Sequence, residues 1–173
     1  SELALLLSLL PIDVNRTVIG MGSNLLIRDG GIDGLIIKLG KSFSSIDIES
    51  DLVSVGASVP DKVLSKFCSS QSIEGFEFLT GIPGCIGGAV AMNAGCYGSE
   101  TKDIFLSADC IDYFGNKISI DKSEKFFSYR NNSRTKDLII LNVKFRKSIG
   151  NKKQITDKMN KINNNRILSQ PQK

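Results

Sequence analysis

The chain has 173 residues, of which 41% are hydrophobic and 23% charged, a composition ordinary for a soluble globular protein with one core. It contains no histidine, and none of its four cysteines forms a CxxC pair, which argues against zinc sites and against Ser-His or Cys-His catalysis. We therefore expect no metal. Scattered cysteines in apolar surroundings favour a reducing, cytoplasmic setting.

The net charge of +4 is unevenly distributed. Residues 144–173 contain nine Lys or Arg and one acid, Asp157, a local net charge of +8, so the rest of the chain carries −4. Basic tails can bind nucleic acid, but this one lacks interleaved aromatic residues beyond Phe145. We expect a solvated helix face or a domain edge, and neither a nucleic-acid partner nor a membrane.

The N-terminal third predicts a helix followed by short strands. The apolar run 2–10 is expected to form a helix ended by Pro11, too short to span a membrane and without the basic front of a signal peptide. Strands are expected at 17–21, 34–40 and 51–58. Pro60 can then open a helix whose apolar positions are 63, 64, 67 and 68.

Strands dominate the rest of the pattern. Residues 103–114 read as a strand, a turn at Gly115-Asn116 leads into KISI (117–120), and 138–145 form a further strand. In the last segment Ile155, Met159 and Ile162 share one helical face. Without regular strand–helix alternation, the pattern favours an α+β fold over a doubly wound parallel sheet.

Two glycine-rich stretches have the composition of a phosphate site. GIPGCIGGAVAMNAGCYGSE (81–100) holds six glycines and no charge before Glu100, and GMGSNLL (20–26) adds donors at Ser23 and Asn24. Converging backbone amides can hold phosphate without lysine, although tight turns with close packing would also explain these glycines. The Walker A spacing is absent, and GxGxxG from Gly20 meets Leu25 instead of its third glycine.

A third stretch, FFSYRNNS (126–133), places Arg130 between an aromatic run and short polar residues. The planar guanidinium suits a carboxylate or a developing enolate. The alternative is a surface arginine paired with Glu124 or Asp137.

Together, residues 20–39, 75–100, YRNNS (129–133) and RILSQP (166–171) resemble the UDP-N-acetylenolpyruvoylglucosamine reductase family. The resemblance implies an FAD-binding domain of the vanillyl-alcohol-oxidase type, with the FAD pyrophosphate between the two loops. We divide it into a first lobe, 1–58, a second lobe, 59–148, and a helix and linker, 149–173. The implied cofactor-binding residues are Gly20, Met21, Gly22, Ser23, Asn24 and Leu25 in the first loop, and Ile82, Pro83, Gly84, Gly87, Gly88, Asn93 and Gly95 in the second.

The resemblance also implies a reaction. NADPH would reduce FAD, which would pass hydride to the enolpyruvyl group of a UDP-sugar, in peptidoglycan precursor synthesis. Arg130 would stabilise the enolate-like intermediate, with Tyr97 facing the substrate and Tyr129 supporting Arg130 or packing. The family's serine proton donor, in a GSxFKNP-like motif, and its glutamate belong to a C-terminal substrate domain. The chain has no GSxF sequence, so we expect that domain to be missing and the chain alone to lack turnover.

Two other readings remain open. One is a different oxidase or dehydrogenase on the same FAD fold, which YRNNS and RILSQP disfavour. The other is a non-catalytic remnant of the reductase that binds nucleotide or a partner protein.

Overall fold

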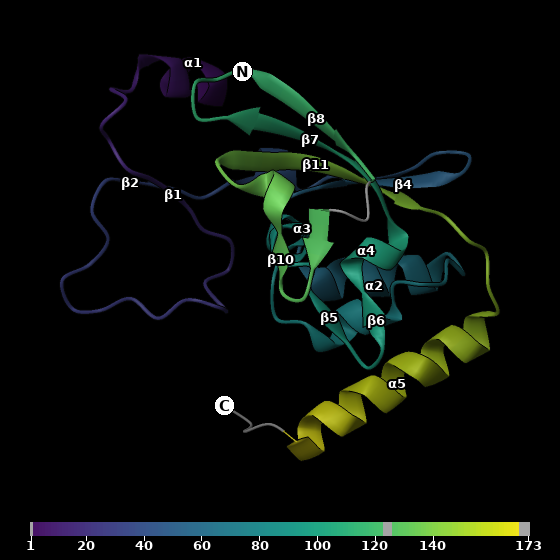
Figure 1. Ribbon diagram of the computed structural model, residues 1–173. Helices are drawn as coiled ribbons and strands as arrows, with labels where there is room; N and C mark the ends of the chain where they lie inside the picture. Colours follow the sequence, from purple (N-terminus) through teal and green to yellow (C-terminus); the bar gives the residue numbers. More distant parts are fainter. Residues whose placement is uncertain (1, 123–125, 170–173) are drawn as a thin grey trace.

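A five-stranded antiparallel sheet forms the centre of the protein in the computed structural model, which describes residues 2–122 and 126–169 (Figure 1). Its strand order is β3-β4-β11-β7-β8. These strands are Ile46–Ile48 (β3), Leu52–Gly56 (β4), Leu138–Arg146 (β11), Phe105–Asp112 (β7) and Lys117–Asp121 (β8). The expected hairpin is present: β7 pairs with β8 through a turn in which Gly115 has a φ of 92°.

The sheet separates two hydrophobic clusters because successive residues of a strand face opposite sides. Ile139 of β11 pairs with Ile111 of β7, and both join Leu7 and Ile37 on one face. Their neighbours Ile140 and Cys110 lie in the larger cluster on the other face. A register shift between Ile140 and Asn142 marks a bulge in β11. The expected strand at 138–145 is thereby confirmed as the central strand.

The smaller cluster holds the N-terminal segment against the sheet. Helix α1 (Glu2–Leu9) contributes Leu7, and the short parallel pair β1 (Arg16–Val18) and β2 (Leu35–Ile37) contributes Ile37. The Arg16 guanidinium donates to carbonyl oxygens of Leu10, Pro11 and Val14 and lies 5.9 Å from the centre of the Tyr113 ring. Figure 1 shows the long connection between β1 and β2 extending away from the sheet.

Helices and short turns cover the larger cluster. They are α2 (Asp61–Ser70), η2 (Glu77–Gly81) and α3 (Ile86–Ala91). The short η1 (Lys41–Phe43) lies between β2 and β3 in the chain. Two small antiparallel ribbons follow: β5 (Gly95–Cys96) with β6 (Ser99–Glu100), and β9 (Phe127–Ser128) with β10 (Asn131–Asn132). The remaining elements are α4 (Thr101–Ile104) and η4 (Ser133–Thr135).

Helix α5 (Lys152–Ser169) lies across η2, at the lower edge of the molecule in Figure 1. Its buried residues are Ile155, Met159 and Ile162, the face expected from the sequence. Lys158 pairs with Glu77 at 3.7 Å, and the Arg166 guanidinium donates to the carbonyl of Gly81. The helix therefore supports the segment that leads into the second glycine-rich stretch.

Some local expectations were wrong. Val63 is 49% exposed, and the buried face of α2 includes Asp61 and Ser65 as well as Leu64 and Cys68. Residues 101–104 are helical, because Glu100 and Asp103 form a reciprocal capping box. Strand β3 and helix α3 were not expected. In the described parts of the chain, no helix is both long and apolar enough to cross a membrane.

Candidate functional site

The two glycine-rich stretches meet in space. Gly20 follows β1, and a Cβ atom built on it would lie 2.6 Å from the Cys85 Sγ at the start of α3. A side chain at position 20 would therefore require the Cys85 Sγ to move. The contact bounds an opening of about 170 Å³, which we call the glycine cavity, lined by Gly20, Met21, Cys85, Gly87 and Gly88 together with Lys38, Leu39, Ala57 and neighbouring residues.

Backbone hydrogen bonds fix the second wall of the glycine cavity. The amides of Ile86 and Gly87 donate to the carbonyls of Val59 and Ala57 at 3.0 and 2.9 Å. A Cβ on Gly87 would stand 3.1 Å from the Ala57 Cβ, so glycine also permits this close approach. Backbone hydrogen bonds therefore join the start of α3 to the segment that follows β4.

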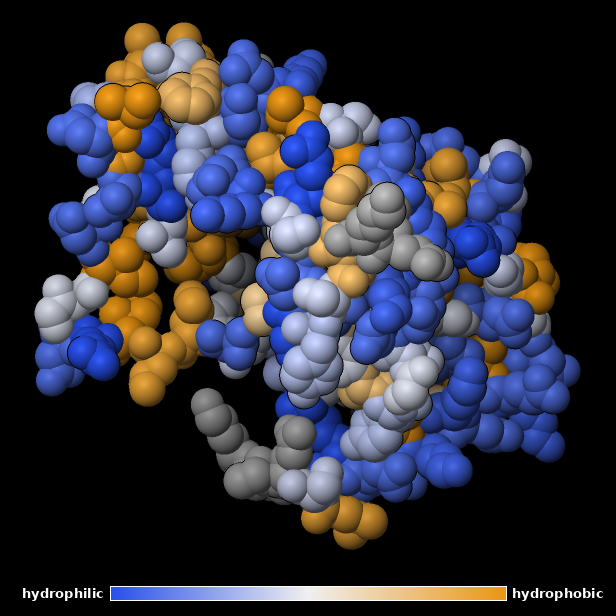
Figure 2. Space-filling view, in the orientation of Figure 1, coloured by the Kyte–Doolittle hydropathy of each residue, from blue (hydrophilic) through white to orange (hydrophobic). Residues whose placement is uncertain are grey.

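The rest of the first loop lies outside the glycine cavity. Residues 21–29 are exposed, and a turn closes from the Leu25 amide to the Gly22 carbonyl at 3.3 Å. Ser23, Asn24 and Leu25 do not line the cavity. Figure 2 shows orange, apolar residues gathered over this side of the molecule. In this loop Leu25, Leu26 and Ile27 are exposed, Leu26 to 97%.

The first part of the second loop, Ile82, Pro83 and Gly84, does not line the cavity and supports the residues that do. Ile82 packs against the larger hydrophobic cluster, and Pro83 is exposed. Gly84 lies against Asp61, since a Cβ on Gly84 would be 2.7 Å from the Asp61 Oδ2. These residues shape the loop but do not line the cavity.

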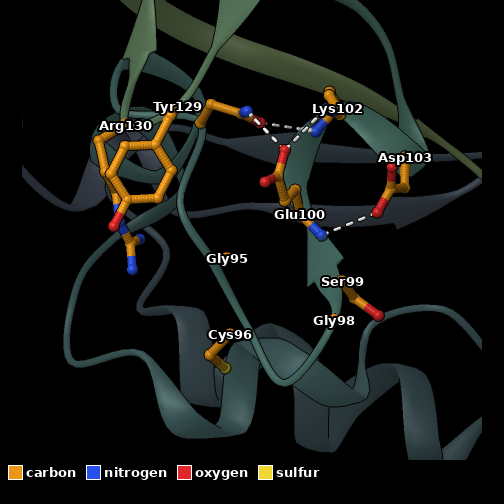
Figure 3. A pocket seen from close by; sticks show the side chains of 10 residues that line it. Gly95, Cys96, Gly98, Ser99, Glu100, Lys102, Asp103, Tyr129 and Arg130 are labelled. Carbon is orange, nitrogen blue, oxygen red and sulfur yellow. Dashed lines mark hydrogen bonds and ion pairs between the residues drawn. The ribbon is translucent and has the colours of Figure 1, made fainter.

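A second opening of about 370 Å³ lies beyond the end of α3 (Figure 3). We call it the arginine pocket. Tyr129 and Arg130 stand on one side, and Glu100, Lys102 and Asp103 on the other. Its full lining is Asn93, Gly95, Cys96, Gly98, Ser99, Glu100, Lys102, Asp103, Tyr129 and Arg130. The structure thus brings Asn93 and Gly95 together with Arg130 and places them apart from the glycine cavity.

Asn93 organises the arginine pocket. Its buried side chain donates to Glu100 Oε2 at 2.9 Å and to the Ser128 carbonyl at 3.1 Å, and it accepts from the Lys102 amide at 3.1 Å. Glu100 also pairs with Lys102 at 2.9 Å. Hydrogen bonds from Lys102 and Asn93 hold the pKa of Glu100 below its ordinary value. The Glu100 carboxylate in the pocket is therefore already paired with Lys102.

Three predicted site residues have positive φ angles: Asn93 (40°), Tyr97 (51°) and Arg130 (55°). Five described residues other than glycine have this left-handed conformation, which is costly for arginine and tyrosine. Such strained residues cluster at functional sites. Tyr97 is half-exposed between the pocket residues Cys96 and Gly98, with its ring near Gly81.

Arg130 is exposed and lies over the Tyr129 ring, 5.7 Å from its centre. The described residues contain two salt bridges, Lys102–Glu100 and Lys158–Glu77, so Arg130 forms none with Asp137. Glu124, the other expected partner, lies outside the described residues. Burial raises the pKa of Cys96, while the charges of Arg166 and Arg130 act to lower it. Arg130 thus directs positive charge into the pocket.

Sequence reasoning missed several residues at these openings. Lys38 lines the glycine cavity, where the sequence led us to expect phosphate binding without lysine. Its position directly after β2, beside the loop that follows β1, was the available signal. Cys85, Cys96 and Glu100 lay within the quoted glycine-rich stretch but were not selected.

These features fit a phosphate-bearing cofactor. Glycines stand where a Cβ would close the opening, two loops converge, and a lysine lies beside them. The sequence model for the FAD binding domain matches residues 12–120. The chain therefore belongs to the FAD binding domain family.

More specific relatives are UDP-N-acetylenolpyruvoylglucosamine reductases. The chain is 51% identical over 155 residues to that of Rickettsia akari and 48% identical over 155 residues to that of Rickettsia typhi. In both cases the match covers 90% of this chain and 52% of the relative. The chain therefore spans about half the length of these relatives, and the resemblance drawn from the sequence is confirmed.

Solved structures agree on the fold. The reductase of Thermus caldophilus superposes with a TM-score of 0.84 at 28% identity, covering 94% of this chain and 59% of that one. A 6-hydroxy-D-nicotine oxidase from Arthrobacter nicotinovorans has a TM-score of 0.59 at 19% identity, covering 79% and 31%. The predicted α+β FAD-binding fold of the vanillyl-alcohol-oxidase type is confirmed.

Proposed function

We propose that this chain binds FAD with its pyrophosphate in the glycine cavity. The observation that carries the proposal is the apposition of Gly20 and Cys85, two residues sixty-five positions apart, across an opening lined by Gly87, Gly88 and Lys38. Loop backbone amides and a lysine are donors suited to phosphate. Because the Ile86 and Gly87 amides already donate to Val59 and Ala57, Lys38 and the amides of the first loop at Gly20 would supply them. The four loop residues from Gly22 to Leu25 would flank the cofactor without lining the cavity.

We propose further that the reaction is the reduction of UDP-N-acetylglucosamine enolpyruvate to UDP-N-acetylmuramate in peptidoglycan precursor synthesis. FAD, when bound, would supply the hydride, which originates from NADPH. A protein group would supply the one proton that completes the reduction. Support comes from the reductases, to which the chain is about 50% identical, and from the Arg130 guanidinium in the arginine pocket. NADPH and a cytoplasmic location come from the family resemblance.

The arginine pocket has residues suited to the second half-reaction, in which the enolpyruvyl substrate is reduced. Arg130 has no ion pair among the described residues and can face a carboxylate and the negative charge that develops beside it. Tyr129 lies against its guanidinium and would limit its orientations. Tyr97, half-exposed next to the pocket, would contact the UDP-sugar. We expect no turnover from these 173 residues alone, because they contain no GSxF proton-donor motif.

Substitution of Gly20 tests the cofactor site. Gly20→Ala should weaken FAD binding at least about tenfold, because a Cβ there overlaps the Cys85 Sγ at 2.6 Å and displaces this side chain within the cavity wall. Gly30→Ala is the matched control, since Gly30 is in the same loop with open space around it. Binding is measured by quenching of FAD fluorescence. If the two variants bound FAD with equal affinity, the assignment of the FAD site to the glycine cavity would be contradicted.

A further inference from the structure

Asp61 lies directly beneath the second glycine loop. It is the first residue of α2, is fully buried, and donates its backbone amide to the Gly84 carbonyl at 3.0 Å. A Cβ on Gly84 would stand 2.7 Å from its Oδ2. The next residues along this loop, Cys85, Gly87 and Gly88, line the glycine cavity. The carboxyl group therefore touches the reverse side of the proposed phosphate-binding loop.

This carboxyl group has no partner among the described residues. Neither of its oxygens is hydrogen-bonded, and the buried hydroxyl of Ser65, one helical turn later, is also unpartnered. A buried polar group without a partner is costly, and far more so when it is charged. Two adjacent groups of this kind under a cofactor loop call for a role other than packing.

The surroundings favour the neutral form of Asp61. On its own helix Lys62 and Lys66 are exposed, and the segments packed against it, 57–60 and 82–88, contain no charged side chain. Burial raises the pKa of Asp61 to about 7, while the nearby Gly84 amide, which approaches the carboxyl without ordinary hydrogen-bond geometry, acts in the opposite direction. Asp61 therefore changes charge near neutral pH.

We propose that Asp61 is a positioning residue whose protonated carboxyl supports the second glycine loop, and that its ionisation weakens FAD binding. The inference rests on the proposed FAD site. A neutral carboxyl leaves the reverse side of the loop uncharged, whereas a carboxylate adds a negative charge there, behind the wall that faces the pyrophosphate. Charges separated by a poorly solvated protein layer repel more strongly than they do in water.

The sign of the pH dependence follows from the two protonation states. Below pH 7 the free protein is already protonated at Asp61, so affinity is constant. Above pH 7 the Asp61 carboxyl of the free protein is ionised, and FAD binding requires it to take up a proton. The affinity for FAD therefore falls as pH rises. The dissociation constant for FAD should increase at least about tenfold between pH 6 and pH 8.5.

The test is a fluorescence titration with FAD from pH 6 to pH 8.5 at constant ionic strength. Asp61→Asn keeps the shape without the charge and should bind equally well across this range. Asp47→Asn, an exposed residue on β3, is the matched control and should keep the wild-type fall. A flat wild-type profile, or an equal fall in Asp61→Asn, would overturn the inference.

Calorimetry of the unaltered protein gives a readout that does not depend on folding of the variant. Binding measured at pH 7.5 in buffers of different ionisation enthalpy should show uptake of about half a proton or more per FAD. No uptake would overturn the inference even if FAD binds well. Absence of FAD binding at every pH would overturn the proposed function and this inference together.

Discussion

Arg130 is held in a left-handed backbone conformation, with a φ of 55°, that arginine adopts at a free-energy cost. Its exposed side chain makes no structural ion pair among the described residues, and its described ring contact is with Tyr129, which is itself 84% exposed. The fold therefore keeps a strained residue that contributes little to stability. This is the expected signature of a residue retained for function.

Replacement of Arg130 by glycine should consequently stabilise the protein. Glycine relieves the left-handed strain, and the free energy of unfolding should rise by about 1 kcal/mol. Arg134→Gly is the matched control, because Arg134, in η4, does not have a positive φ. Its replacement by glycine should lower the free energy of unfolding. Urea denaturation measures both. Destabilisation of Arg130→Gly by more than the control would mean that Arg130 is structural.

Asp61 should make the protein less stable as pH rises. Its pKa is about 7 when folded and near 3.8 when unfolded, so the folded state binds the proton more tightly throughout this interval. Stability is then greatest at the acidic end and is lost as pH rises through 7. Glu100 and Asp112, whose pKa values are lowered, act only below about pH 5 and with the opposite sign.

Urea denaturation at pH 5 and pH 8 tests this effect. The wild-type free energy of unfolding should fall by about 2–3 kcal/mol over this interval through Asp61. Asp61→Asn should remove that fall. Parallel pH profiles for the two proteins would contradict the assignment.

At the scale of elements, helix α5 fixes the start of the second glycine loop. Ile162 is buried and its Cγ2 lies 3.1 Å from the position of a Cβ on Gly81, the last residue of η2. A hydrogen bond between Thr80 and Asn163, at 3.4 Å, joins the same two elements. Packing at the end of η2 thus determines where residues 82–88 begin.

Truncation of Ile162 should therefore affect both stability and the loop. Ile162→Ala should cost about 2–4 kcal/mol through the cavity that it leaves, and should weaken FAD binding as well. Ile167→Ala on the same helix, 56% exposed, should change stability by less than about 1 kcal/mol. A small, equal effect of both substitutions in thermal or urea denaturation would show that α5 does not support η2.

Elements with strong local signals could be predicted from the sequence. Pro60 opened α2, Gly115 placed the β7–β8 turn, and the apolar spacing in α5 identified its buried face. Helix α3 was missed because its sequence, IGGAVA, has two glycines and is held by bonds to Ala57 and Val59. Those partners are close only after β4 has joined the sheet.

Several residues that line the two openings were selected from the sequence, but their arrangement was not predictable. Glycine content and the family motifs identified Gly20, Gly87, Gly88 and Arg130. Nothing local indicated that Asn93 would bind Glu100 and Ser128 and so belong to the arginine pocket. Burial of Asp61 beneath Gly84 likewise depends on how α2 packs against a loop twenty residues later.

At the scale of the whole molecule, the sheet gathers two openings around α3. The glycine cavity lies at the start of this helix and the arginine pocket follows its end. A flavin dinucleotide with its pyrophosphate in the first opening and its reactive ring toward the second would join them.

The most direct test is a visible absorption titration of the 173-residue protein with FAD. We expect a change in the flavin spectrum that saturates at one equivalent, because the one glycine cavity would take one pyrophosphate. Circular dichroism on the same sample establishes that the protein is folded. A folded protein that leaves the flavin spectrum unchanged at every ratio would contradict this expectation.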